Sequence, residues 1–252
     1  MTAALLLIGN ELLSGKVQEQ NQRPLARMLR SVGIPLVRAV TVPDAIDTIA
    51  AEVRALAAQH RWLFTSGGVG PTHDDVTLAA VAQAFDVPIV RDPVFAARVE
   101  RQYAERLTAA HLRMADVPEG AVLVTGEPAG WPIVRKDNVW IMPGVPEVFR
   151  MKLGVIKNEL PKAEGFCTHS VYTLLDEGFL APLLDRVVAA FPEVEVGSYP
   201  KWFDATYKTK LTFDGQDEAK VAAACKLFLT LLPAGEPQTI EVDGPAKERE
   251  RT

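Results

Sequence analysis

A glycine-rich segment that ends in two acids, TSGGVGPTHDD at residues 65–75, holds the residue types best suited to chemistry. Glycines let backbone N–H groups approach an anion closely, and the start of a following helix adds a favourable electrostatic potential. The segment has neither the Gly-Lys-Ser/Thr of a P-loop nor the spacing of a GxGxxG motif. We therefore expect the amides of residues 67–72 to hold a phosphate by a loop of another type.

The adjacent acids Asp74 and Asp75 are unexpected beside a loop that binds an anion. One of them can simply cap the following helix, but neighbouring helical side chains point in different directions, so the other would face the loop. A carboxylate repels a phosphate unless a cation lies between them, and Mg²⁺ commonly binds in that way. The pair therefore indicates a divalent-metal site with Mg²⁺ as the expected ion. His73 is either an acid or base for catalysis or an exposed loop histidine without a role.

The segments around this loop alternate between apolar runs and amphipathic stretches. Residues 3–9, 35–43 and 61–65 have the composition of buried strands, and residues 22–33, 46–57 and 76–85 have helical spacing of apolar residues. Asp44 is the expected N-cap of the second of these helices. The rhythm predicts a parallel sheet with crossover helices, in which the glycine loop lies at the carboxyl end of a strand, where ligands usually bind.

The pattern continues with shorter elements and then changes. Asp92-Pro93 predicts a helix start and a long helical stretch to about residue 114, and residues 131–144 predict a hairpin before another helix. We expect domains at residues 1–162 and 166–235, the second a small α+β domain of β-α-β-β-α order. The polar tail at residues 236–252 is predicted to be disordered.

Composition limits the classes of function. The formal net charge of −5 provides no broad basic field, so we expect no nucleic-acid partner. The apolar run near the start is too short for a membrane span and has no cationic segment before it, so we expect no membrane partner. Two cysteines make no disulfide framework, and a cytoplasmic location is the expectation.

Several motifs together resemble one family. SGGVGPTHDDVT resembles the GG-x-G-P-T-x-DD-x-T segment of the molybdopterin-binding (MoaB/Mog-like, MoCF) domain, in particular the amino-terminal domain of the CinA competence/damage-inducible proteins and the corresponding region of FAD synthases. IGNELLSG and IMPGVPEVF resemble two further motifs of that domain, and VGSYPKWFDATYKTKLTF is similar to a segment of FAD synthases.

The resemblance implies a three-layer α/β/α domain with a mostly parallel sheet, in which the glycine loop, the first loop and the PGVP turn converge on a pocket for a pterin or a nucleotide. It implies metal-dependent hydrolysis of a pyrophosphate in an ADP-ribose- or FAD-like nucleotide, and family habit implies a homo-oligomer. Carried over by position, the catalytic candidates are Asp75, Asp74, His73 and Glu11. The ligand-binding candidates are Ser66, Gly67, Gly68, Gly70, Thr72, Asn10, Asn21, Pro143, Gly144 and Pro146.

Two positions depart from the family motifs. Asn10 stands where the first motif usually has aspartate, and Glu19 stands where the first loop usually has aspartate two residues before Asn21. These changes favour an alternative hypothesis, in which the protein binds molybdopterin or a nucleotide without turning it over. Asn10 could still offer a neutral oxygen to a metal or a hydrogen bond to a ribose. A third hypothesis gives the loop a structural role only.

Overall fold

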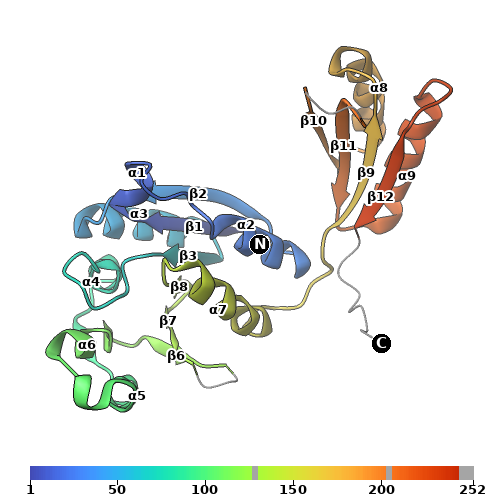
Figure 1. The fold of residues 1–252 in the computed structure, drawn as a ribbon. Helices are drawn as coiled ribbons and strands as arrows, with labels where there is room; N and C mark the ends of the chain where they lie inside the picture. Colours follow the sequence, from blue (N-terminus) through green and yellow to red (C-terminus); the bar gives the residue numbers. More distant parts are fainter. Residues whose placement is uncertain (127–129, 203–205, 244–252) are drawn as a thin grey trace, which may run out of the picture. The chain divides into compact units, whose positions relative to one another are not determined.

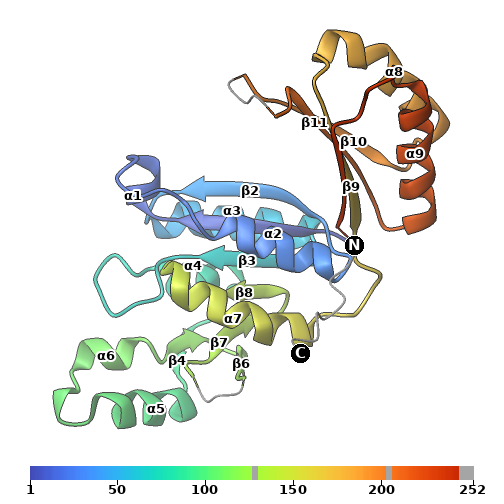
Figure 2. The ribbon, with the colours of Figure 1, turned by 45° about the vertical axis from the view of Figure 1, so that its right-hand side comes forward.

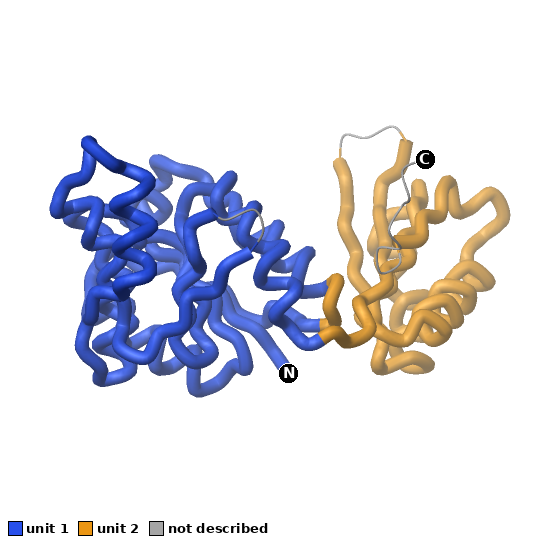
Figure 3. The backbone as a smooth tube through the Cα atoms, turned by 90° about the horizontal axis from the view of Figure 1, so that it is seen from below, with its two compact units in different colours: residues 1–30, 34–161 blue, residues 31–33, 162–252 orange. Residues whose placement is uncertain are grey.

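The computed structural model describes residues 1–126, 130–202 and 206–243, and it divides into two compact units. Unit 1 comprises residues 1–30 and 34–161, and unit 2 comprises residues 31–33 and 162–252 (Figure 3). Each unit has a sheet and a hydrophobic core of its own.

Unit 1 is built on a six-stranded sheet with the order β2-β1-β3-β8-β7-β6 (Figure 1). The sheet is parallel from β2 to β8 and antiparallel from β8 to β6. All six residues of β1 are buried, which agrees with the continuous apolar run in its sequence. The strands are β1 (Ala3–Ile8), β2 (Leu36–Val42), β3 (Trp62–Ser66), β6 (Val122–Val124), β7 (Ile133–Lys136) and β8 (Val139–Ile141).

Helices cover both faces of this sheet and form a three-layer α/β/α arrangement, as predicted. Apolar residues of α3 and α4 pack on one face, against Ala4, Leu6 and Ile8 of β1. Helices α2 and α7 lie on the opposite face (Figure 2). The helices of this part are α1 (Asn10–Leu13), α2 (Gln22–Ser31), α3 (Ile46–Gln59), α4 (Thr77–Ala84) and α7 (Pro146–Glu159).

The segment between α4 and β6 differs from its prediction. Asp92 does cap a helix, since its Oδ1 accepts from Phe95 N at 2.8 Å, but the single helix expected to residue 114 is broken. Ala104 has a positive φ of 44°, and Thr108 begins a new helix with a capping box. The elements are β4 (Ile89–Arg91), α5 (Pro93–Tyr103), a 3₁₀ turn η1 (Ala104–Arg106), α6 (Ala109–Arg113) and β5 (Asp116–Pro118).

Unit 2 is a four-stranded antiparallel sheet in the order β10-β11-β9-β12. Its helices α8 and α9 bury Leu180, Val187, Phe228 and neighbouring apolar residues against one face of the sheet. Cys167 and Cys225 lie in this core as free, buried thiols. The elements are β9 (Cys167–Thr173), α8 (Glu177–Ala190), β10 (Glu195–Pro200), β11 (Thr209–Gly215), α9 (Glu218–Leu231) and β12 (Thr239–Asp243).

Strand β12 corrects the prediction of a disordered tail from residue 236. Residues 239–243 pair with β9, and Tyr172 donates a hydrogen bond to Glu241 Oε2 at 2.6 Å. All five residues of this edge strand are exposed, including Ile240 and Val242, which alternate with polar residues as in a strand. The rest of the predicted tail, residues 244–252, lies outside the described residues. No helix in the described part of the chain is long and apolar enough to cross a lipid bilayer.

Candidate functional site

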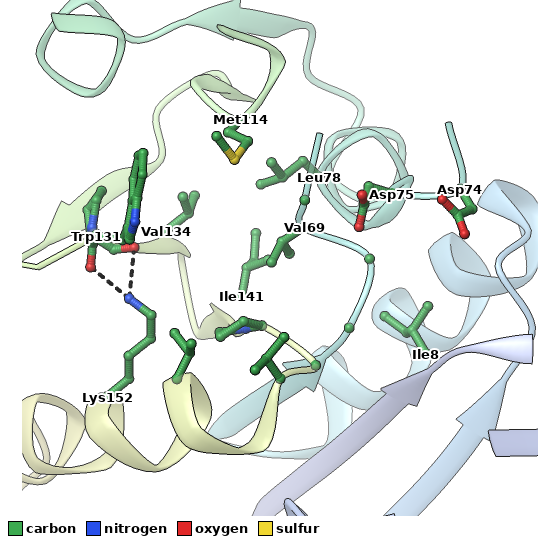
Figure 4. Close-up of a pocket in the computed structure, with 18 of the residues that line it drawn as sticks. Ile8, Val69, Asp74, Asp75, Leu78, Met114, Trp131, Val134, Ile141 and Lys152 are labelled. Atoms are coloured by element: carbon green, nitrogen blue, oxygen red, sulfur yellow. Dashed lines mark hydrogen bonds between the residues drawn. The ribbon is translucent and has the colours of Figure 1, made fainter. Parts of the chain in front are cut away.

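A cavity of about 540 Å³ opens in unit 1 where parallel strands of the sheet end (Figure 4). Ile8 at the end of β1, Gly67 directly after β3 and Ile141 at the end of β8 all line it. This is the edge at which the sequence placed the glycine loop, and it is where open α/β sheets bind ligands. The volume lies within the range of about 300–1,000 Å³ that is usual for small-molecule sites.

The glycine loop bends sharply away from β3 because two of its glycines adopt left-handed backbone conformations. Gly67 has φ of 114° and Gly68 has φ of 66°, which residues with a Cβ rarely adopt. A Cβ at Gly67 would also collide with the carbonyl oxygen of Ile8. Thr77 then closes the loop, since its Oγ1 donates to Gly67 O at 2.8 Å and its N donates to Gly68 O at 3.0 Å.

Only part of the loop offers free amides. The prediction that all amides of residues 67–72 hold a phosphate is wrong for Gly67 and Thr72. Gly67 N donates to Met142 O at 3.1 Å, and Thr72 N donates to Asp75 Oδ2 at 2.8 Å. Pro71 has no N–H. The amides of residues 68–70 make no hydrogen bond within the described part of the chain, and all three residues line the cavity.

Three segments that are distant in sequence meet beside this loop. Asn21 Nδ2 donates to Ser66 Oγ at 2.9 Å and to Gly144 O at 2.8 Å, so one buried amide ties the first loop to the glycine loop and to the PGVP turn. A Cβ on Gly144 would lie 3.2 Å from the Cα of Gly67, a tight contact, so glycine at position 144 suits the close approach of these two segments. Asn21 and Ser66 therefore support the cavity without lining it.

Asp74 and Asp75 converge on a single hydroxyl group. Thr72 Oγ1 lies 2.6 Å from Asp74 Oδ1 and 2.5 Å from Asp75 Oδ2. The hydroxyl has one proton and can satisfy only one of these carboxylates. The hydrogen bond from Thr72 is the largest cause that lowers the pKa of Asp74, so Asp74 stays ionised at neutral pH. The other carboxylate then faces the hydroxyl oxygen without a proton between them. A proton or a cation bound there would relieve this repulsion between oxygen atoms.

Neither acid caps α4. The helix begins at Thr77 with Val76 at the cap position, and no side chain accepts a hydrogen bond there. The capping interpretation of Asp74 or Asp75 is therefore wrong, because both carboxylates point back to Thr72 within the loop.

Two further carboxylates, those of Glu11 and Asp44, line the cavity. Glu11 extends from α1, and its carboxylate has no hydrogen bond or ion pair within the described residues. Asp44, which we predicted to cap α3, instead accepts a hydrogen bond from Asn10 N at 2.8 Å, and Ala45 occupies the cap position. The sequence offered one indication that Asp44 lines the site, namely its position just after the second strand, at the edge of the sheet where ligands bind.

These oxygens suit a hard divalent cation. Carboxylate and hydroxyl oxygens are the ligands that Mg²⁺ prefers, and it often binds through one or two carboxylates together with substrate phosphates. No group of three or more His, Cys, Asp or Glu residues in the described chain is arranged to hold a metal by itself. Asp74, Asp75 and Thr72 therefore fit a cation that a phosphate helps to bind, and they do not fit a closed structural metal site.

Other predicted site residues lie elsewhere. The side chain of His73 is 96% exposed and does not line the cavity, although its Nδ1 lies 3.8 Å from Asp74 Oδ1. Pro146 is the first residue of α7, where it shapes the helix start. Glu19, in the first loop, accepts hydrogen bonds from the amides of Asn21 and Gln22 and so caps α2.

The opposite end of the cavity is apolar, and the sequence did not indicate it. Its walls come from α5, the segment before β5, and the start of the hairpin (Figure 4). Trp131 lines the cavity, whereas Trp140 is buried and stacks on Phe64. Lys152 of α7 also lines this end, with its amine directed at the backbone of the hairpin. The apolar wall includes Phe95, Tyr103, Met114, Trp131 and Val134.

Comparison with known proteins decides the family. Residues 4–162 match the family described as probable molybdopterin binding domain. The chain belongs to this molybdopterin-binding family. Residues 165–240 match the family described as the middle domain of FAD synthase, so both parts of the predicted resemblance are confirmed.

The matches to individual relatives cover different fractions of those proteins. A protein of Archaeoglobus fulgidus is 31% identical over 247 residues, which cover 92% of this chain and 98% of that protein. A probable FAD synthase of Caenorhabditis elegans is 29% identical, and the match covers 92% of this chain but 50% of that protein. The chain therefore spans about half the length of that FAD synthase.

A solved structure supports the fold of unit 1. The crystal structure of the protein CinA from Thermoplasma acidophilum, a protein of unknown function, is 26% identical in sequence and superimposes with a TM-score of 0.58. The match covers 63% of this chain and 96% of that one. The predicted MoaB/Mog-like α/β fold is thereby confirmed.

Proposed function

We propose that the cavity of unit 1 binds a nucleotide that contains a pyrophosphate, such as FAD or ADP-ribose, and hydrolyses it with a divalent cation. The observation that carries this proposal is the combination, at one end of one cavity, of free loop amides with two carboxylates that share one hydroxyl. The amides suit phosphate oxygens, and the carboxylates suit the cation that must accompany them.

Each residue then has a distinct task. The amides of Gly68, Val69 and Gly70 donate to a phosphate, and the start of α7 after Gly144 adds favourable potential from the other side. Asp74 and Asp75 hold the cation together with Thr72. When bound, the cation supplies neutralisation of the pyrophosphate charge and polarisation of a water molecule.

Glu11 is the residue best suited to accept a proton from the attacking water. Its carboxylate lines the acidic end and is free of hydrogen bonds within the described residues. Asp44 fixes the start of α1 through Asn10 N and thereby positions Glu11. His73 has no direct part in this scheme because it points to solvent.

The names of relatives support a nucleotide as the ligand class. One relative is a probable FAD synthase, and residues 165–240 match a FAD synthase domain. The apolar end of the cavity offers a site for a flat ring next to the phosphate site. A nucleotide that joins a ring to a pyrophosphate matches both ends.

The direct test is an incubation of the purified protein with FAD or ADP-ribose and with Mg²⁺, Mn²⁺ or Co²⁺. We expect release of AMP that depends on the metal and is abolished by EDTA. Absence of AMP with every metal, in a preparation that binds the nucleotide by calorimetry, would reject hydrolysis.

A second candidate function is binding without turnover, with molybdopterin or a nucleotide as the ligand. It is favoured by the state of Glu19 and Asn10, the two positions that differ from the family motifs. The carboxylate of Glu19 accepts a hydrogen bond from the first amide of α2 and is therefore engaged within the protein. Asn10 has a neutral side chain in place of a carboxylate. Saturable calorimetric binding of a pterin or nucleotide, with no product after prolonged incubation, would select this candidate over the first.

A further inference from the structure

The apolar end of the cavity has the form of a ring-binding site. Trp131 packs against Phe95 with an interplanar angle of 63° and against Tyr103 with an angle of 42°, at centroid distances of 5.7 Å and 6.2 Å. The three rings come from α5 and from the start of the hairpin, and Met114 and Val134 complete the wall. Aromatic and thioether groups of this kind pack well on a flat conjugated ring.

One charged group lies among these apolar side chains. Lys152 is 9% exposed, and its Nζ donates to Trp131 O at 2.7 Å and to Pro132 O at 3.3 Å. An ammonium group has three protons. Its third proton has no acceptor within the described part of the chain, although the side chain lines the cavity.

Burial of this charged amine lowers the stability of the folded protein. Burial, and to a smaller extent the nearby positive charge of Arg98, lowers the pKa of Lys152 from 10.5 to about 8. A methionine of similar length would fill the space without that cost. The two backbone carbonyls hold the amine in place but leave it one donor short of full satisfaction. The remaining donor is therefore available to a guest in the cavity.

We propose that Lys152 determines specificity at the apolar end by donating its third proton to a carbonyl or unprotonated nitrogen at the edge of a flat heteroaromatic ring. The inference rests on the proposed function, since it assumes that the cavity holds a nucleotide. The ring would lie against Trp131 while the pyrophosphate of the same ligand lies at residues 68–70. A ligand that has the phosphates but no such ring would gain nothing from Lys152.

The test compares Lys152→Met with Lys157→Met, a change of an exposed lysine on the same helix. Calorimetry with the full chain measures the affinity for FAD and, separately, for inorganic pyrophosphate. We expect Lys152→Met to weaken FAD binding about 10- to 100-fold, as loss of a hydrogen bond from a charged donor does. Pyrophosphate affinity should be unchanged, and Lys157→Met should bind both ligands like the wild type.

The wild-type chain supplies a second measurement that does not depend on the folding of a variant. FAD affinity should fall between about pH 7.5 and 9.5, as Lys152 loses its proton. The other charged or titratable side chains beside this wall are His111, which stacks on Tyr103, and Arg98, the charged neighbour of Lys152.

The outcomes distinguish this inference from the proposed function. If the wild type binds FAD but Lys152→Met binds it equally well, the role of Lys152 is refuted and the proposed function stands. Equal losses for FAD and pyrophosphate also refute it, because the lysine would then act on phosphate charge. If the wild type binds no nucleotide at any pH, the proposed function and this inference fail together.

Discussion

The two ends of the cavity are stabilised in different ways. At the loop end, the interactions are local: Thr72, Asp74 and Asp75 bond to one another within four residues of sequence, and the acids are exposed or half-buried. At the apolar end, Phe95, Trp131 and Lys152 are brought together from three separate elements by packing. The loop end is therefore suited to charge and exchangeable ligands, whereas the apolar end is suited to a fixed shape. Each prediction below perturbs one of these two ends.

The largest effect is expected at the bend of the glycine loop. Gly67→Ala would force an alanine into φ of 114° and drive its Cβ into Ile8 O. We expect a loss of about 2–5 kcal/mol in unfolding free energy, since left-handed strain costs about 1–2 kcal/mol and a core clash about 1–3 kcal/mol. Denaturant unfolding measures it.

Gly15→Ala is the matched control for this change. Gly15 also has a positive φ, 72°, but no atom lies within 4 Å of the Cβ position. It should show the strain alone, about 1–2 kcal/mol. Equal losses in the two variants would mean that the close approach of the loop to β1 contributes nothing.

The next largest effect concerns catalysis at the loop end. Asp75→Asn keeps an oxygen for the bonds from Thr72 N and Oγ1 but removes the charge that a cation needs. We expect metal-dependent AMP release to fall about 10- to 100-fold, the usual cost of disturbing a metal site. Initial rates over a series of Mg²⁺ concentrations measure the change.

Asp86→Asn serves as the control for this variant. Asp86 has a side chain that is 90% exposed and makes one long ion pair with Arg54. Its rate should equal that of the wild type. A rate for Asp75→Asn that also equals the wild type would remove Asp75 from the proposed mechanism.

The sequence predicted the loop end because its features are continuous in the chain. The apolar runs of β1 and β3 and the helical spacing of α2 are local patterns, and the glycines mark the turn between strand and helix. The strand β12 was missed although Ile240 and Val242 alternate with polar residues, because so short a run within a polar and charged tail is a weak signal.

The apolar end could not be predicted in this way. Phe95, Met114 and Lys152 lie on elements whose own patterns indicate only helices and turns, and their shared cavity results from tertiary packing. Asp44 shows the same limit, because local rules favour a helix cap but its carboxylate bonds to Asn10, 34 residues away. The local sequence indicates which hydrogen bonds a side chain can make, and tertiary contacts determine which of them it does make.

A smaller effect, on stability, is expected at the apolar end. Because the pKa of Lys152 is about 8 in the folded chain and 10.5 ordinarily, the unfolded chain binds more protons between these values. Wild-type stability should therefore gain from this group as the pH rises from about 8 to 10.5. Lys152→Met should lack that gain and be more stable than the wild type at pH 7, by a net amount of about 1 kcal/mol, because two lost hydrogen bonds offset part of the benefit.

The stability difference between the two proteins should be followed from pH 7 to pH 11 by urea unfolding. Cys225 has the opposite dependence, since burial raises its pKa from 9.0 to about 11 and favours unfolding above pH 9. Both proteins contain Cys225, so its contribution cancels in the difference. A difference that does not shrink as the pH rises would show that Lys152 is not held as a buried charge.

The smallest effect is expected for Asp74, whose side chain is 59% exposed. The hydrogen bond from Thr72 lowers the pKa of Asp74, so this carboxylate contributes stability above its ordinary pKa of 3.8 and loses it as the pH falls through the lowered value. Asp74→Asn should therefore be slightly less stable than the wild type at pH 7 and equal to it in strong acid. Added Mg²⁺ sharpens the test: if Asp74 and Asp75 share a cation, millimolar Mg²⁺ with pyrophosphate should stabilise the wild type more than Asp74→Asn, whereas an acid that only orders the loop would leave both proteins with the same increase in melting temperature.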